Sequence, residues 1–187
     1  MPKTSDEVAN VQRLSSTAHW DVPVITPQGP LHLLAWAATP PVFDGPEDRN
    51  GRRNHDEAAF WMHRLPKAPF ALIGNLNLDL IDGEGRAEAL HSLLTDAQDP
   101  APRGAFQPPQ NGANATQRGD PALDTAEYDE NRSGNLRVDY ILPARAMQVL
   151  ASAVVWPAPA DPLADAVAAA SNHRLVWVDV VMPPMAD

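Results

Sequence analysis

Two short, almost uninterrupted apolar runs constrain the fold of this chain more than any other feature. They read LHLLAW from Leu31 to Trp36 and FALIG from Phe70 to Gly74. Runs this short are typical of strands that are covered on both faces. Such strands need a layer of structure on each side, so the sequence predicts a layered fold built around a sheet.

Other segments predict the remaining elements. Residues 19–25 (HWDVPVI) indicate a strand that pairs with 31–36 through a turn at 26–30. A helix is expected to begin near Asn54, because Asn54 and Glu57 have the spacing of a capping box. Further strands are expected at 136–142, 149–156 and 174–181, and further helices at 86–94 and 161–170.

The order of these elements predicts an α/β or α+β layered fold in one domain, and 187 residues are enough for one sizeable core. Residues 1–18 are polar and are expected to be a flexible segment, 19–181 to form the domain and 182–187 a tail. Residues 96–135 show weak periodicity. A loop this long inside a compact domain is usually functional or disordered.

Composition excludes some classes of function. The chain has no cysteine, so a metal could be held only by oxygen or imidazole ligands. The formal net charge is −10 and no basic run exceeds Arg52-Arg53, which argues against tight nonspecific binding of nucleic acid. No apolar run approaches the roughly 18 residues of a membrane span. The N-terminus lacks the apolar core of a signal peptide, which leaves the compartment open.

Polar residues at three places could form a site. Asn75 and Asn77 follow the buried strand 70–74, Asp139 lies inside an apolar strand, and His173 comes directly before the last strand. Asp139 and His173 could pair, with the acid fixing the tautomer of the ring. From the residues alone, other readings stay open: an Asx turn at Asn75, an exposed strand acid at Asp139 and a surface histidine at His173.

Taken together, these motifs resemble the endonuclease/exonuclease/phosphatase family. That family carries Gly-Asp-x-Asn after a core strand, then Arg-x-Asp-Tyr, then Ser-Asp-His before the last strand. This chain has, in the same order, Gly74-Asn75-Leu76-Asn77, Arg137-Val138-Asp139-Tyr140 and Ser171-Asn172-His173. The resemblance covers about residues 10–181, corresponds to the C-terminal half of the family's domain, and is closest to a bacterial branch.

The resemblance implies part of a four-layer αββα sandwich that hydrolyses phosphodiesters or phosphomonoesters with Mg²⁺ or a similar divalent cation. The implied partner is a phosphate-ester substrate: a small molecule, a lipid head group or nucleic acid. Relatives are often exported. By position, the catalytic residues would be Asn75, Asn77, Asp139 and His173, the metal contact Asn172, and the phosphate contacts Arg53 and Asn54.

The chain also departs from the family pattern. Asn75 and Asn172 stand where the family has aspartates, and an amide carries no charge and cannot take a proton. The family's metal-binding Glu lies in an N-terminal half that this chain lacks. We therefore expect either an incomplete hydrolase with weakened catalytic positions or a non-catalytic binding or structural module of the same fold. An open sheet edge predicts marginal stability or self-association.

Overall fold

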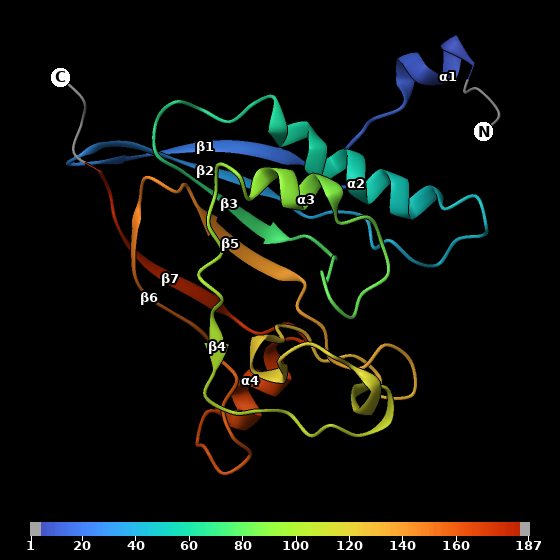
Figure 1. Ribbon diagram of the computed structural model, residues 1–187, viewed down its shortest axis with the longest axis vertical. Coiled ribbons are helices and arrows are strands. Elements are labelled where there is room, and N and C mark those ends of the chain that lie inside the picture. The colour runs from blue at the N-terminus through green and yellow to red at the C-terminus, as the bar shows by residue number, and fades with distance from the viewer. Residues whose placement is uncertain (1–4, 184–187) are drawn as a thin grey trace.

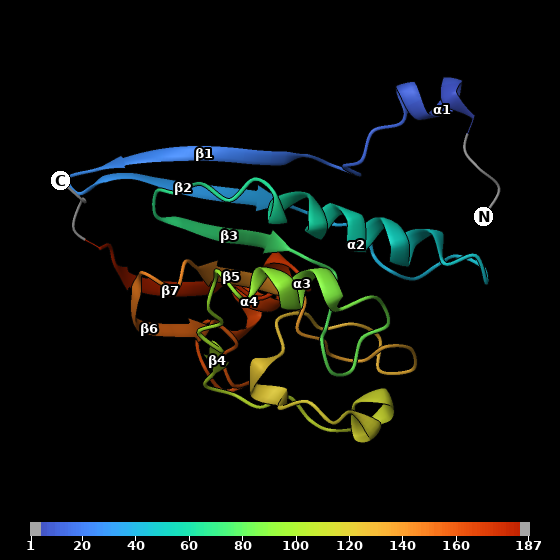
Figure 2. The ribbon, with the colours of Figure 1, turned by 45° about the horizontal axis from the view of Figure 1, so that its top comes forward.

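The computed structural model describes residues 5–183 and contains two sheets. Parts of the predicted N-terminal segment (1–4) and tail (184–187) lie outside the described residues. The β5 and β7 strands contact each other, so the second sheet continues beyond the edge of the first (Figure 2). The strand orders are β1(His19–Thr26)-β2(Gly29–Trp36)-β3(Phe70–Asn75)-β5(Asp139–Pro143) and β4(Arg103–Gly104)-β6(Gln148–Val154)-β7(Val176–Val181).

The helices confirm the predicted mixed α/β class. Among residues 5–183, no helix is both long and apolar enough to cross a bilayer. The predicted long loop 96–135 contains only β4 and two 3-10 turns, η1(Gly112–Thr116) and η2(Pro121–Leu123). The α-helices are α1(Asp6–Val11), α2(Arg49–Met62), α3(Glu88–Leu93) and α4(Ala164–Ala170).

The start of α2 corrects one prediction. The helix begins at Arg49 rather than near Asn54, so the predicted capping box is wrong. Asn54 and Glu57 lie inside the helix and are buried. The Asn54 side chain donates to the backbone carbonyls of Thr39 and Leu76, each at 2.8 Å. The Asn54 side chain faces inward, and its two hydrogen bonds hold the loops that contain Thr39 and Leu76.

Glu57 also fixes the segment that leads into β1. Its carboxylate accepts hydrogen bonds from the backbone N–H groups of Ser16 and Thr39, each at 2.6 Å. The Thr17 hydroxyl donates to the carbonyl of Ala37 at 2.9 Å. The part of the predicted flexible segment nearest β1 is therefore bonded to the domain.

One face of the four-stranded sheet carries the main core. Helices α2 and α3 lie against this face (Figure 1). Alternate residues of β2, β3 and β5 point towards the helices and are almost completely buried. The core includes Leu34, Trp36, Leu72 and Leu142 from the sheet with Trp61, Leu90 and Leu93 from the helices.

The opposite face of the same sheet is apolar but open. Trp20, Ala35, Ile73 and Ile141 are successive cross-strand neighbours from β1 to β5, so their side chains share that face. Trp20 is 65% exposed, and the other three are half-buried. The apolar runs predicted that both faces of the sheet are buried. Within residues 5–183, only the face that packs against the helices is buried completely.

Candidate active site

Gly74 sets the geometry at the end of β3. Its φ is +142°, and a Cβ there would lie 1.9 Å from the carbonyl oxygen of Trp36 in β2. Only glycine allows this close approach of two parallel strands. The next residue, Asn75, then lies directly opposite Asp139 in the antiparallel ladder of β3 and β5. Two polar side chains that are far apart in the sequence thus meet at the ends of neighbouring strands.

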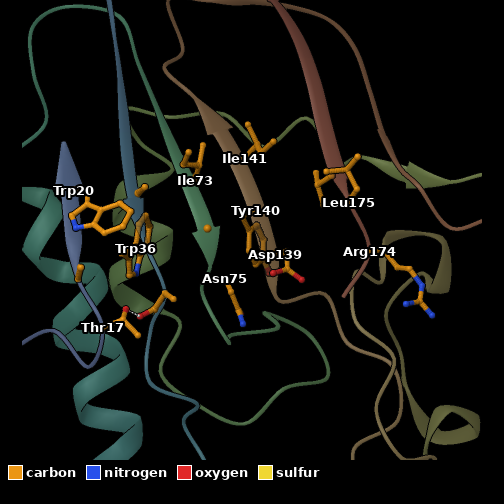
Figure 3. Close-up of a pocket in the computed structure, with 15 residues that line it drawn as sticks. Thr17, Trp20, Trp36, Ile73, Asn75, Asp139, Tyr140, Ile141, Arg174 and Leu175 are labelled. Atoms are coloured by element: carbon orange, nitrogen blue, oxygen red, sulfur yellow. Dashed lines mark hydrogen bonds between the residues drawn. The ribbon is translucent and has the colours of Figure 1, made fainter. Parts of the chain in front are cut away.

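Asn75 and Asn77 form a tight turn after β3. The Asn75 Oδ1 accepts from the backbone N–H of Asn77 at 2.8 Å, and Asn77 has a φ of +48°. The Asn77 Nδ2 donates to the carbonyl of Ala38 at 2.8 Å. Asn75 therefore forms an Asx turn and also lies at the strand end where the site was predicted. The side chain of Asn75 projects beyond the end of the sheet, near Asp139 (Figure 3).

The predicted pair of Asp139 and His173 is present. The His173 Nδ1 lies 2.7 Å from Asp139 Oδ2. His173 reaches Asp139 because Ala126 forms β-bridges to both Leu136 and His173. The loop around Ala126 therefore fastens the start of β7 to the start of β5, and the two side chains come together without belonging to paired strands.

Two residues of the long loop complete this arrangement. The hydroxyl of Thr125, which is fully buried, donates to Asp139 Oδ2 at 3.0 Å. The Tyr128 hydroxyl lies 3.5 Å from His173 Nε2, with the two rings nearly perpendicular at 5.9 Å between centroids. The predictions named neither residue. The only sequence signal for them was the expectation that a loop this long is functional.

Burial controls the electrostatics of this group. It raises the pKa of Asp139 above the ordinary value, although the hydrogen bonds from His173 and Thr125 act in the opposite direction. Burial, followed by the charge of Asp139, also raises the pKa of the Tyr128 phenol. With Nδ1 of His173 facing the acid, the other ring nitrogen, Nε2, lies on the side of the Tyr128 hydroxyl.

A pocket of about 580 Å³ opens beside Asn75 and Asp139 (Figure 3). Its walls are mainly apolar and come from the open face of the sheet and from the segment leading into β7. The polar atoms of the strand ends lie at one side of it. Its apolar lining includes Trp20, Trp36, Ile73, Ile141 and Leu175, and its polar lining consists of Thr17, Asn75, Asp139, Tyr140 and Arg174. The predicted site residues Asn77 and His173 do not line it.

The described residues do not by themselves fit a divalent metal ion. Among residues 5–183, no three acidic or histidine side chains are spaced to hold one. Asp139 is the one carboxylate lining the pocket, and its Oδ2 is shared by His173 and Thr125. Hard cations usually take several oxygen ligands. Asn172, the predicted metal contact, is exposed, and its backbone carbonyl accepts from Glu127 N–H at 2.8 Å.

The predicted phosphate contacts lie elsewhere. Neither Arg53 nor Asn54 lines the pocket. Arg53 Nε donates to the carbonyl of Leu14 at 3.0 Å and lies 3.6 Å from Glu57. Asn54 is buried, and its amide donates to two backbone carbonyls, so here it holds neighbouring segments together. The phosphate contacts of Arg53 and Asn54 stay predictions.

Comparisons with known proteins agree with this architecture. A sequence profile described as the endonuclease/exonuclease/phosphatase family matches residues 4–173. No curated protein matches the chain. Among solved structures, the endonuclease/exonuclease/phosphatase from Beutenbergia cavernae DSM 12333 is similar, with 17% identity and a TM-score of 0.55. That alignment covers 87% of this chain and 38% of the other.

A family protein from Leptotrichia buccalis C-1013-b aligns over 87% of this chain and 53% of its own, with 15% identity and a TM-score of 0.47. The chain therefore spans less than two thirds of either solved relative. The likeness to the Beutenbergia structure supports the fold alone, whereas the profile match over most of the chain defines the family.

Proposed function

Because this chain belongs to the endonuclease/exonuclease/phosphatase family, we propose that it forms part of an enzyme that hydrolyses phosphoester bonds. The observation that supports the proposal is the 2.7 Å pair of His173 and Asp139. Asp139 lies opposite Asn75 in the β3–β5 ladder, and these two residues line the pocket. An imidazole oriented by a carboxylate at the end of sheet strands is suited to proton transfer.

In the proposed reaction, water attacks phosphorus and the bond from phosphorus to the leaving oxygen breaks. His173 donates its Nδ1 hydrogen to Asp139, so the neutral ring keeps a lone pair on Nε2. This nitrogen accepts the proton of the attacking water and returns it to the leaving oxygen. Asp139 holds the ring in place and stabilises the imidazolium that forms between the two transfers.

Asn75 and Asn77 have a different role in this proposal. Amide N–H groups can donate hydrogen bonds to the non-bridging oxygens of phosphate, whose negative charge grows as water attacks. Asn75 cannot remove a proton from water, because an amide has no basic lone pair comparable to that of a carboxylate. We therefore expect proton transfer to depend on His173 and the rate to be low.

We also propose that full activity needs Mg²⁺ and polypeptide that this chain does not contain. Family members generally use divalent cations, which would polarise the phosphate. The described residues provide no metal site of their own, so we assign no step of this chain to the ion. Asn172 remains a proposed contact to such an ion, because its exposed side chain precedes His173.

The net charge of −10 favours a small phosphoester or a lipid head group over duplex DNA as the substrate.

The open apolar face of the four-stranded sheet, with Trp20 65% exposed, supports a second proposal about partners. Exposed apolar surface of this kind is usually covered in a protein's working state. We propose that the isolated chain associates with itself through this face.

One observation favours a second candidate function, a phosphate-binding module without catalysis. The Oδ1 of Asn75, at the position where the family has an acid, is occupied by the backbone N–H of Asn77. In that case the site would recognise a phosphoester without activating water.

The test uses hydrolysis of bis(p-nitrophenyl) phosphate with Mg²⁺ and, in parallel, binding of the unreactive dimethyl phosphate followed by ³¹P NMR. The His173→Ala variant is compared with His32→Ala. His32 is a matched control because it also lies 2.7 Å from an aspartate, Asp21, but on the outer hairpin. Hydrolysis that is lost only in His173→Ala supports the enzyme. Binding without hydrolysis, lost in the same variant, supports the module, and absence of both rejects the assignment.

A further inference from the structure

A second cavity, of about 330 Å³, shares only Tyr140 with the pocket of the candidate active site. It lies between loops rather than on the open face of the sheet. Four carboxylates and several apolar side chains line it. The acids are Asp79, Asp99, Asp120 and Asp124, and the apolar residues include Leu80, Ile81 and Leu123.

Three of the four acids are satisfied by the protein. Asp79 accepts hydrogen bonds from three backbone N–H groups, at 2.8 to 2.9 Å. Asp99 pairs with Arg137 through two bonds of 2.6 and 2.8 Å. Asp120 pairs with Arg103 at 2.7 Å. Arg137 and His91 also line the cavity, but among the residues that the structure describes no salt bridge reaches Asp79 or Asp124.

Asp124 is the exception. The residue is 8% exposed, and its Oδ2 is buried with no hydrogen-bond partner among the residues the structure describes. Burial and the charges of Asp79, Asp82 and Asp120 raise the pKa of this carboxyl to about 7. An unpaired carboxylate in such a place is costly unless a donor with positive charge reaches it.

The chemistry of the cavity distinguishes between two kinds of cation. Among residues 5–183, no three acidic or histidine side chains are spaced to coordinate a metal directly, which argues against a bare metal ion. An ammonium group brings its own N–H donors and needs only one or two carboxylates. Leu80, Ile81 and Leu123 provide apolar surface for a short alkyl chain. The volume is within the range of small-molecule sites.

We propose that this cavity binds a small alkylammonium ligand whose ammonium group donates hydrogen bonds to Asp124. The ligand's methylene groups lie against Leu80, Ile81 and Leu123. Neither the phosphoesterase reaction nor the residues proposed for it take part, so this site stands independently of the proposed function.

Isothermal titration of the full chain at pH 8 with 1,4-diaminobutane tests the proposal, with 1-butanol as the uncharged probe and MgCl₂ and CaCl₂ as metal probes. Asp124→Asn keeps the shape of the side chain and removes its charge. Asp165→Asn, on the exposed surface of α4, is the control for the same change in charge. Circular dichroism confirms that each variant is folded.

The expected result is saturable binding of the diamine to the wild type and to Asp165→Asn, weaker by roughly tenfold or more in Asp124→Asn, and no binding of butanol. Equal affinity in Asp124→Asn or absence of saturable binding would overturn the proposal. So would binding of Mg²⁺ or Ca²⁺ without binding of the diamine, because the site would then be one for metal.

Discussion

Thr125 holds both the backbone and the side chain of Asp139. Its hydroxyl donates to Asp139 Oδ2 at 3.0 Å and accepts from the backbone N–H of the same residue at 2.9 Å. It also accepts from the N–H of Val138 at 3.0 Å. One buried hydroxyl from the long loop therefore fixes the start of β5 and the acid that orients His173.

Thr125→Val removes this hydroxyl while keeping the shape of the side chain. Two N–H groups, one buried and one partly buried, lose their acceptor, so the free energy of unfolding should fall by roughly 2 kcal/mol. Urea denaturation measures the change. Thr95→Val, at an exposed threonine, should change the stability by less than about 0.5 kcal/mol. If the two variants are equally stable, Thr125 does not have this role.

Asp139→Asn should lower hydrolysis of bis(p-nitrophenyl) phosphate by about 10²–10⁴-fold, because a neutral amide cannot stabilise the imidazolium of His173. The Nδ1–H resonance of His173 in ¹H NMR should move or disappear. Asp21→Asn, which alters the exposed pair with His32, serves as the control. An unchanged rate in Asp139→Asn would show that the pair is structural.

The raised pKa of Asp139 also predicts the acid side of the pH profile. The pair requires the ionised carboxylate, and protonation removes the charge that stabilises imidazolium. Because burial moves the pKa above the ordinary 3.8, activity should decline at a less acidic pH than an exposed aspartate would give. A pH profile of kcat measures this. If kcat falls only at or below pH 3.8, the ordinary pKa of an aspartate, the prediction is contradicted.

Asp124→Asn should stabilise the protein at high pH. The folded-state pKa of about 7 exceeds the unfolded value of 3.8, so the native state binds the extra proton between these values and stability falls as pH rises through this window. The ionised form therefore costs at most about 4 kcal/mol above pH 7. Thermal melts at pH 4 and pH 8 should show a gain for Asp124→Asn only at pH 8. Equal gains at both values would mean that charge is not the cause.

Gly74→Ala should destabilise the fold by about 2 kcal/mol or more, because the added Cβ would collide with the carbonyl of Trp36 and the backbone has positive φ. Denaturant unfolding gives the change. In the control, Gly45→Ala, the new Cβ meets only the flexible carboxylate of Glu47, which can move away. A Gly74→Ala protein of normal stability would show that β2 and β3 can separate here.

Trp20→Glu should reduce association of the isolated chain, since it places a charge on the open face of the sheet. Sedimentation velocity over a range of protein concentrations measures this. Ile25→Glu is the matched control, because Ile25 is 81% exposed on the same strand but alternates to the opposite face. A wild-type chain that stays monomeric at all concentrations would contradict the proposed self-association.

Much of the fold follows from local sequence. The apolar runs of β2 and β3, the hairpin before them and the strand that holds Asp139 were predictable because strand periodicity depends on neighbouring residues. The same local patterns placed Asn75 and His173 next to the ends of strands. The pairing of His173 with Asp139 was predicted from the two residues, whereas the position of Asn75 opposite Asp139 was not.

Tertiary structure alone decided how the long loop folds. Asp82 accepts hydrogen bonds from the backbone N–H groups of Arg118 and Gly119, each at 2.7 Å, and so ties two distant parts of the chain together. Bonds of this kind bring Thr125 to Asp139 and bury Asp124. They join a carboxylate to backbone N–H groups 36 or 37 positions away, for which a short window of sequence has no periodic signal, so only the folded chain shows them.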